Sequence, residues 1–427
     1  MWLLDKLLNQ VIVRGRLVVT DHDGKIYRYG AGEGAEAPIN IRLTHPKAAT
    51  HIARHPQVGA GEAFMWGWLV VEPPHDIRDL ILFFTMNSKR HGDAAIQAQG
   101  PVRRLAEKAL AAVDGFNPKG RARKNAEHTY NLTRRLYELF LDEDRQYTMA
   151  YYRDPANSLE QAQVDKKAHV AAKMFIKPGM RVLDIGCGWG GFALFLAKHY
   201  DVEVTGVALA PDQIAFCKER AEAEGLADRV KFELMDYREV TGSFDRISSV
   251  GLLEHVGTIH YPQFYEHTHR LLKPDGVMLS HCCGRTGPPG HTDAWTRKYI
   301  FPGGYIPALS ELVTESERAG WQIMDVEGMR FHYCHTLEEW YNRTVMHREE
   351  IEALYDEQFY RMWLFYLAGA EQSFRHGTMV NWQILYVKDR AAIPMTRDYI
   401  EAESARLRAA ASVPTWHLDP ALRQAAE

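Results

Sequence analysis

Long apolar runs are missing from this 427-residue sequence: none approaches the roughly 20 residues that a membrane-spanning helix requires. The opening stretch MWLLDKLLNQVIVRGRL is apolar, but Asp5, Lys6 and Arg14 interrupt it and no small-residue cleavage site follows. We therefore expect neither a signal peptide nor a transmembrane segment. If the protein acts on lipid, it visits the membrane surface.

Cysteine and net charge are also scarce. The five cysteines form no C-x-x-C pair, so the sequence offers no zinc-type ligand set, and reduced thiols in a cytoplasmic protein are expected. The formal net charge of −4 argues against binding nucleic acid through bulk charge. The cysteines are Cys187, Cys217, Cys282, Cys283 and Cys334.

The chain is too long for one ordinary core, so more than one domain is expected. Residues 1–95 predict a small α+β domain, because residues 11–21 alternate in polarity and DHDGKIYRYG contains an Asp-Gly turn between β-forming residues. We expect residues 96–128 to form a linker. A helical C-terminal tail is expected over 396–427.

The predicted linker contains four basic residues close together, in GFNPKGRARKN. A solvated connector is one interpretation of this segment. The other is a contact with an anionic lipid surface, to which each basic residue contributes about 1 kcal/mol. The four are Lys119, Arg121, Arg123 and Lys124.

Residues 129–395 predict the main domain, which is of the α/β class. Short apolar strands such as MRVLDIG, VEVTGVAL and FDRISSVGL alternate with stretches of helical spacing such as GGFALFLAKHY and PDQIAFCKERAEAEG. This alternation is typical of a parallel sheet with right-handed crossovers.

A glycine-rich turn follows the first of these strands, in RVLDIGCGWGG at 181–191. Gly186, Gly188 and Gly190 allow a tight turn and a close approach of the backbone to a ligand, and the next helix offers free N–H groups. Such a pattern fits NAD as well as other nucleotides. Asp184 favours a cationic ligand instead, because a carboxylate beside a pyrophosphate would repel it. S-adenosylmethionine (SAM) carries a sulfonium and an ammonium group and no phosphate.

The residues at the ends of two further strands help to decide between SAM and NAD. Asp236 follows the third strand, where it could accept a hydrogen bond from an adenine amino group. The tip after the second strand has no acid for the ribose hydroxyls, which leaves Gln213 and the backbone of Leu209 for that role. The sequence therefore favours SAM over NAD.

Acid–base groups follow the next two strands. Glu254 and His255 come just after FDRISSVGL, and His281 follows GVMLS. Each alone is most simply a turn cap or a satisfied core histidine. At neighbouring carboxyl ends of a parallel sheet, beside a nucleotide loop, they become candidate catalytic residues.

Taken together, several segments resemble the cyclopropane-fatty-acyl-phospholipid synthase family, which includes the mycolic acid cyclopropane synthases. The resemblance covers roughly 130–390, and the first 95 residues resemble the lipid-binding N-terminal domain of the bacterial phospholipid enzymes. The segments, in the family's order, are YTMAYYRD, KPGMRVLDIGCGWGG, FDRISSVGLLEHVG, RLLKPDG, KYIFPGGYIP and NWQILY.

The resemblance implies a class I SAM-dependent methyltransferase fold, Rossmann-like with a mostly parallel seven-stranded sheet and an acyl-chain tunnel. The implied reaction adds the SAM methyl carbon across a cis double bond of a phospholipid acyl chain. A carbocation forms, bound bicarbonate removes a proton, and a cyclopropane ring closes. The resemblance further implies a cytoplasmic enzyme, peripheral at the inner membrane, and a homodimer.

The resemblance also implies site residues. The bicarbonate site maps onto Glu254, His281 and Tyr341, and onto Met149 and Cys283 where the family has Cys and Ile. The last two positions are implied to contribute backbone groups. For the cofactor, the resemblance adds Tyr147 and Thr148. Aromatic faces would stabilise a carbocation, and the candidates are Tyr299, Phe301, Tyr305, Trp340, Tyr341, Trp363, Phe365 and Tyr366.

Met149 and Cys283 leave a second product open, because the same cation could end as a methyl-branched or methylene-bearing chain after a hydride shift and proton loss. A small-molecule methyltransferase is a further alternative, and the lipid-binding N-terminal domain argues against it. A non-catalytic lipid-binding protein would predict a damaged glycine loop or the loss of Glu254, and neither is seen.

Overall fold

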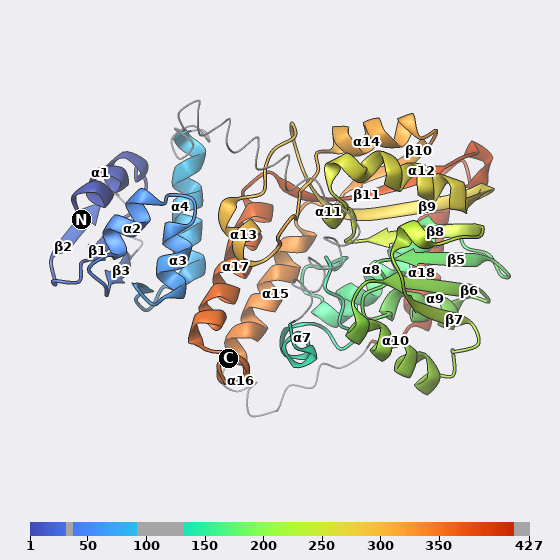
Figure 1. Ribbon diagram of the computed structural model, residues 1–427, viewed down its shortest axis with the longest axis horizontal. Coiled ribbons are helices and arrows are strands. Elements are labelled where there is room, and N and C mark those ends of the chain that lie inside the picture. Colours follow the sequence, from blue (N-terminus) through green and yellow to red (C-terminus); the bar gives the residue numbers. More distant parts are fainter. Residues whose placement is uncertain (31–36, 92–131, 414–427) are drawn as a thin grey trace. The chain divides into compact units, whose positions relative to one another are not determined.

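The computed structural model describes residues 1–30, 37–91 and 132–413 (Figure 1). The predicted linker, 96–128, lies outside the described residues. The chain divides into two compact units, of which the first combines 1–111 with 293–301 and 340–377, and the second comprises 112–292, 302–339 and 378–427. Among the described residues, no helix combines the length and the apolar character that a membrane crossing demands.

The first unit begins with a four-stranded sheet in the order β2-β1-β3-β4. Strands β1 and β2 form the expected hairpin around the Asp-Gly turn, and β1 pairs in parallel with β3. Leu17 and Val19 of β1 are fully buried, as the alternation predicts. The elements are β1 (Leu17–Thr20), β2 (Ile26–Tyr29), β3 (Ile39–Leu43), β4 (Leu69–Val71), α1 (Trp2–Val11), α2 (Ala48–Arg54), α3 (Gly59–Met65) and α4 (Ile77–His91).

Helices from the C-terminal third complete this unit. Helix α17 (Glu357–Arg375) packs on α3 and α4 through its apolar face, which buries Trp363 and Leu367. A bidentate ion pair reinforces the contact, since Arg78 of α4 donates to both oxygens of buried Glu371 at 2.8 and 3.0 Å. The same unit contains α13 (Ala294–Tyr299), α16 (Arg348–Leu354) and the second half of α15 (His332–Met346).

The second unit contains the predicted α/β fold. Its seven-stranded sheet has the order β10-β11-β9-β8-β5-β6-β7, and the five strands from β9 to β7 are parallel. Only β11 runs antiparallel to both of its neighbours, so the expectation of a mostly parallel sheet is confirmed. The strands are β5 (Arg181–Ile185), β6 (Glu203–Ala208), β7 (Val230–Leu234), β8 (Phe244–Val250), β9 (Leu272–Arg285), β10 (Gln322–Gly328) and β11 (Met379–Val387).

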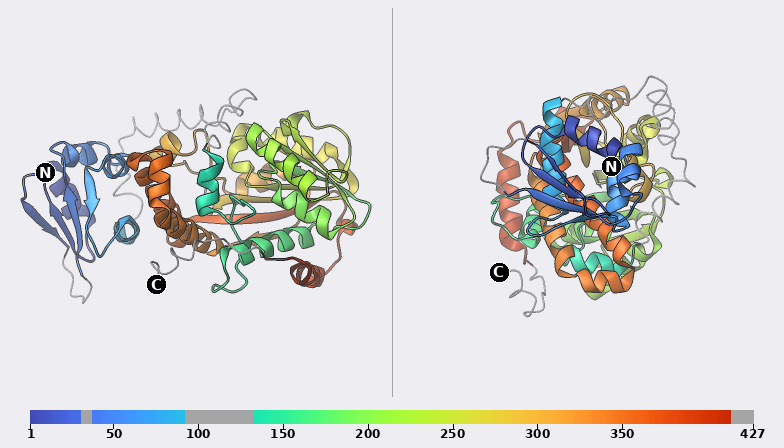
Figure 2. Two further views of the ribbon diagram at one scale, coloured as in Figure 1. Left: turned by 90° about the horizontal axis from the view of Figure 1, so that it is seen from below. Right: turned by 90° about the vertical axis from the view of Figure 1, so that its left-hand side faces the viewer.

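Helices cover both faces of this sheet (Figures 1 and 2). Successive residues of β5 enter different cores: Val182 packs with the helices of one face and Leu183 with those of the other. The first face carries α8 (Leu159–Lys173), α9 (Gly191–His199), α10 (Pro211–Ala223) and α18 (Asp398–Ala410), and the second carries α11 (Leu253–Val256), α12 (Tyr261–Leu271) and α14 (Leu309–Arg318). The predicted tail at 396–427 is described as far as residue 413 and contains α18.

Candidate functional site

The glycine loop lies at the carboxyl end of β5. Gly186, Gly188 and Gly190 have φ angles of 81°, 52° and 80°, in the left-handed region that favours glycine. Gly190 precedes α9, and a Cβ there would lie 2.8 Å from the ring of Phe232 and 2.9 Å from the sulfur of Cys217. Gly190 is therefore needed for packing between the loop and the sheet.

A pocket opens above this loop, at the carboxyl edge of the parallel strands. It is lined by the turns after β5, β6, β7 and β8, together with residues 145–148 and one side of α8. All of the sequence-predicted cofactor residues except Gly190 line it. They are Tyr147, Thr148, Asp184, Gly186, Gly188, Leu209, Gln213 and Asp236.

The two acids of the pocket differ in their partners. Asp184 is buried and accepts a hydrogen bond of 2.7 Å from Ser248, and burial raises its pKa to about 6. Asp236 is held by Arg238, whose guanidinium donates to both carboxylate oxygens at 2.8 and 2.6 Å. An adenine amino group would therefore share Asp236 with this arginine.

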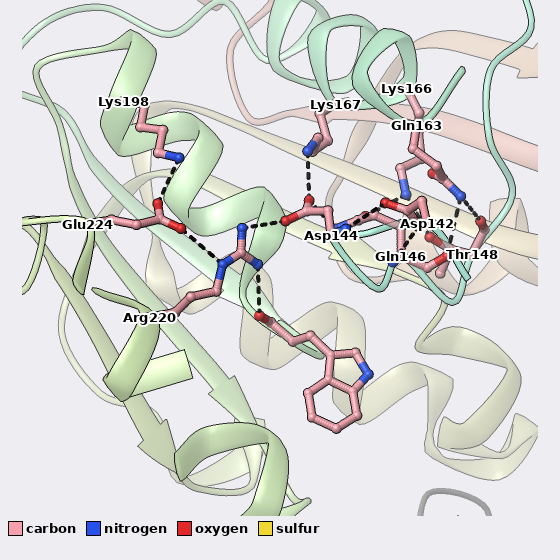
Figure 3. A network of polar contacts seen from close by, with 11 residues as sticks. Asp142, Asp144, Gln146, Thr148, Gln163, Lys166, Lys167, Lys198, Arg220 and Glu224 are labelled. Atoms are coloured by element: carbon pink, nitrogen blue, oxygen red, sulfur yellow. Dashed lines mark hydrogen bonds and ion pairs between the residues drawn. The ribbon is translucent and has the colours of Figure 1, made fainter. Parts of the chain in front are cut away.

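A network of polar and charged side chains includes several residues of the pocket lining (Figure 3). Asp144 binds the ammonium of Lys167 at 2.6 Å and the guanidinium of Arg220 at 2.5 Å. Although burial acts in the opposite direction, these two cations lower the pKa of Asp144. The sequence analysis missed this network because its members come from three separate segments.

Lys166 belongs to this network and, like Lys167, also lines the pocket. Its ammonium donates to Gln146 Oε1 at 2.6 Å and to Thr148 Oγ1 at 2.8 Å, as Figure 3 shows. Burial lowers its pKa to about 7, against the opposing effect of Asp142. Lys166 thus ties the predicted cofactor residue Thr148 to helix α8.

Glu254 and Cys283 meet beside this pocket. Glu254 lies on α11, just after β8, and its Oε1 accepts the backbone N–H of Cys283 at 2.5 Å. No described residue bonds its other carboxylate oxygen, Oε2, although that atom is buried. Burial raises the pKa of Glu254 to about 7. The N–H that the resemblance implies for the anion is therefore already bonded to Glu254.

His281 precedes Cys283 by two residues on β9 and is fully buried. Its Nδ1 lies 3.1 Å from the amide nitrogen of Gln383, and its Nε2 has no partner among the described residues. Burial lowers the pKa of His281 to about 3, so the imidazole is neutral at physiological pH.

Met149 is fully buried in the segment that carries Tyr147 and Thr148. The backbone N–H of the next residue, Ala150, donates to Thr336 Oγ1 at 3.0 Å. The Cys283 sulfur lies 3.5 Å from the amide nitrogen of Asn381, on β11. Neither Met149 nor Cys283 is among the residues that line the pocket above the glycine loop.

Tyr341 belongs to the first unit, on the second half of α15. Its hydroxyl donates to Asp76 at 2.9 Å, and the guanidinium of Arg78 lies 5.1 Å from its ring centre. Burial raises its pKa. The structure thus brings Glu254, Cys283 and His281 together in one unit and describes Tyr341 in the other.

The aromatic residues that could stabilise a carbocation are also divided between the two units. Tyr305 belongs to the second unit, where its N–H donates to the Glu254 carbonyl at 2.8 Å. Phe301 and Tyr366 meet edge to face in the first unit, with ring centres 5.6 Å apart, and Tyr366 also contacts Trp363. The other candidates, Tyr299, Trp340 and Phe365, lie in the first unit as well.

Comparisons with known proteins point to one group. The sequence profile of the family described as mycolic acid cyclopropane synthetase matches residues 117–384. The cyclopropane-fatty-acyl-phospholipid synthase of Escherichia coli K12 is 35% identical over 84% of this chain and 90% of its own length. A probable fatty acid methyltransferase of Pseudomonas putida is 36% identical over 63% of this chain and 71% of its own. The crystal structure of mycolic acid cyclopropane synthase CmaA1 with SAH and CTAB superposes with a TM-score of 0.60 at 28% identity, covering 64% of this chain and 99% of that protein.

Proposed function

The chain belongs to the mycolic acid cyclopropane synthetase family, and on this basis we propose that it is a SAM-dependent cyclopropane-fatty-acyl-phospholipid synthase. It transfers a methylene carbon to a cis double bond of a phospholipid acyl chain. The pocket residues suit the cofactor, since the left-handed glycines admit a close ligand and Asp184 presents a carboxylate to a cationic group. When bound, SAM would supply an electrophilic methyl carbon to the alkene and would leave as SAH.

The observation that carries the proposal is the pair of unpartnered buried atoms at Glu254 and His281. Glu254 Oε2 can accept a hydrogen bond and His281 Nε2 can donate one, so the two atoms suit a small polar guest. Bicarbonate fits, because its hydroxyl can donate to Glu254 Oε2 while its oxygens accept from a neutral His281. In the proposed reaction, bicarbonate accepts the proton that leaves the transferred carbon, and the ring closes as the second carbon–carbon bond forms.

These residues also allow bicarbonate, rather than a side chain of the protein, to accept the proton, so that the acceptor is replaced after each turnover. A carboxylate beside a carbocation can itself be alkylated, which would end the catalytic cycle. The Oε1 atom of Glu254 is already bonded to the N–H of Cys283, which holds the side chain in place. Glu254 therefore orients the bicarbonate, and the bicarbonate leaves as carbonic acid after each turnover.

A second product is a methyl-branched or methylene-bearing acyl chain, formed after a hydride shift by loss of a proton from another chain carbon in the first case and from the transferred carbon in the second. Met149 and Cys283 keep this second product open, because the family has Cys and Ile at these two positions. Product analysis with deuterated SAM methyl separates the methyl-branched chain from the other two products, and mild hydrogenation separates the methylene, which it reduces, from the cyclopropane, which it leaves intact. Loss of a proton from the transferred carbon leaves two of the three deuterium atoms, whereas loss of a proton elsewhere on the chain leaves all three.

Substrate access requires contact with a membrane, and a surface of the first unit suits it. Residues 37–61 contain no Asp or Glu and include Arg42, Lys47 and Arg54. Next to them in the fold, the ring of His45 stacks on Trp68 at 4.1 Å, and Trp66 is 37% exposed. Aromatic rings and basic side chains together suit the headgroup region of an anionic bilayer.

The proposal is tested by expressing the chain in a host without cyclopropane fatty acids and analysing the acyl chains of its lipids. New acyl chains heavier by one methylene group support the proposal. In the Glu254→Gln variant these chains should disappear while SAH binding, measured by calorimetry, is retained. Unchanged product formation by that variant would contradict the role given to Glu254.

A further inference from the structure

Strand β11 places a glutamine directly opposite the candidate catalytic histidine. Gln383 and His281 are cross-strand partners in the antiparallel pair of β11 and β9. Both side chains are fully buried, and the Gln383 Nε2 atom lies 3.1 Å from His281 Nδ1. Cross-strand partners lie on the same face of a sheet, and so do residues two apart on one strand. The pair therefore shares its face with Cys283 and Asn381.

In the structure the Gln383 amide nitrogen faces His281 Nδ1, and this orientation of the amide sets which imidazole nitrogen carries the proton. An amide nitrogen can only donate, so in this arrangement His281 Nδ1 is the acceptor and has no hydrogen. A neutral imidazole has one N–H, which must then be on Nε2. That atom is the buried nitrogen of His281 without a partner among the described residues.

Burial, and to a lesser degree the neighbouring charges, keeps this imidazole neutral. Burial lowers the pKa of His281 to about 3, and Lys166, Lys173 and His169 act in the same direction. Glu327 opposes them, and it is the cross-strand partner of Gln383 on β10. Its carboxylate is bound to His169 at 2.8 Å and to Lys173 at 2.5 Å. Within the described part of the sheet, Gln383 is thus the hydrogen-bond partner of His281 Nδ1.

We propose that Gln383 is a positioning residue that holds His281 as the Nε2–H tautomer, with its donor aimed at the anion. Glu254 Oε2 then provides the matching acceptor. A bicarbonate ion has one hydroxyl to donate and oxygens that must accept, so one donor and one acceptor select it and fix its orientation. This inference rests on the proposed function, whereas the tautomer itself can be measured in the free enzyme.

The first test uses the wild-type protein alone. In a long-range nitrogen–proton NMR spectrum of histidine-labelled protein, His281 is assigned by its absence from the His281→Asn variant. The inference predicts a protonated Nε2 and a bare Nδ1 at pH 7. A protonated Nδ1 would overturn it, whatever reaction the enzyme catalyses.

The second test changes the partner of Nδ1. The Gln383→Glu variant offers a carboxylate that accepts from Nδ1, which removes the proton from Nε2 or creates an imidazolium. The Gln383→Met variant keeps the bulk and removes the hydrogen bond. The control is Gln322→Met, because Gln322 lies in the same sheet and its amide donates to the carbonyl of Lys388.

Activity is measured against bicarbonate concentration in buffer purged of carbon dioxide. Both Gln383 variants should raise the apparent KM for bicarbonate about 10-fold or more, the effect expected from one misplaced hydrogen bond to a charged group. Their affinity for SAH should stay within about 2-fold of wild type, since Gln383 does not line the cofactor pocket. The Gln322→Met variant should match wild type in both.

Wild-type bicarbonate dependence in Gln383→Glu would overturn the inference. If that variant does not fold, as judged by SAH binding and thermal unfolding, the wild-type NMR spectrum decides alone. If no acyl product forms with the wild type either, the proposed function fails while the tautomer measurement still stands.

Discussion

At the scale of single residues, the account depends most on Glu254. Its carboxyl group is buried, its Oε1 atom accepts the N–H of Cys283, and its Oε2 atom has no hydrogen-bond partner among the described residues. Removing its charge should therefore have opposite effects on activity and on stability. The sequence placed Glu254 at the right sheet edge, because strand alternation predicts that edge. It did not indicate that the N–H of Cys283 holds the carboxylate, since that contact depends on the final packing.

Stability should depend on pH through Glu254. Its folded-state pKa of about 7 exceeds the ordinary glutamate pKa of 4.5, so the folded protein binds the proton more tightly than the unfolded chain does. Stability from this group is present at low pH and is lost as pH rises from about 4.5 to about 7, by on the order of 3 kcal/mol. The Glu254→Gln variant should gain stability relative to wild type over that interval, measured by urea unfolding at several pH values. A stability difference that is constant with pH would contradict the raised pKa.

Activity should show the complementary pH profile. In the proposed reaction, Glu254 accepts a hydrogen bond from bicarbonate only when ionised, so kcat/KM should rise with pH through about 7. His281, whose pKa is lowered to about 3, should contribute no ionisation between pH 5 and 8. Initial rates at fixed bicarbonate concentration check this. A fall in kcat/KM between pH 6 and 8 would count against an ionised Glu254.

At the scale of elements, helix α8 and the segment before it form one supporting structure. The ammonium of Lys167 and the guanidinium of Arg220 neutralise buried Asp144, and Lys166 fixes Gln146 and Thr148 beneath the pocket (Figure 3). The sequence predicts α8 from its helical spacing. It does not predict the network, because nothing local pairs a lysine on α8 with an aspartate more than 20 residues earlier.

Breaking this network should be costly. The Lys167→Met variant leaves Asp144 buried with one fewer cation, which should lower the free energy of unfolding by about 3 kcal/mol. Lys198→Met is the matched control, because Lys198 is 46% exposed and its ion pair with Glu224 should contribute less than about 1 kcal/mol. Denaturant unfolding measures both. Equal losses of unfolding free energy in the two variants would show that the buried ion pair contributes no more to stability than the exposed one.

Gly190 supplies a second test at this scale. Alanine there must adopt a φ of 80° and place its Cβ against the Phe232 ring. Gly225→Ala is the control, since Gly225 has a φ of 66° and nothing within 4 Å of a new Cβ. Gly225→Ala should cost about 1 kcal/mol, and Gly190→Ala at least about 2 kcal/mol more from overpacking. Urea unfolding of both variants checks the difference, and a similar cost would contradict the packing role of Gly190.

At the scale of the whole molecule, the α/β fold of the second unit could be predicted from the sequence more readily than the helix packing of the first unit. Hydrophobic periodicity and the alternation of strands with helices indicated the α/β fold. The sheet order β10-β11-β9-β8-β5-β6-β7 was not predicted, because right-handed crossovers fix the hand of each connection and not which strands are neighbours. The packing of α17 on α3 and α4 was not predicted. Its apolar face is visible in the sequence, but periodicity does not say which distant helices will cover it.

The membrane surface proposed for the first unit can be tested on the intact protein. Replacing Lys47 and Arg54 by Glu should weaken binding to vesicles containing anionic phospholipid by about 10-fold or more, at about 1 kcal/mol per basic residue removed, and should spare SAH binding. Vesicle sedimentation at two salt concentrations measures this. Equal binding of wild type and variant would exclude this surface.

Analytical ultracentrifugation tests the predicted homodimer.

The most direct measurement of the central claim is mass spectrometry of the acyl chains formed from an unsaturated phospholipid, bicarbonate and SAM with a trideuterated methyl group. The account predicts a product that retains two deuterium atoms and survives mild hydrogenation, as a cyclopropane does and an exocyclic methylene does not. A product with three deuterium atoms, or no modified acyl chain at all, would contradict it.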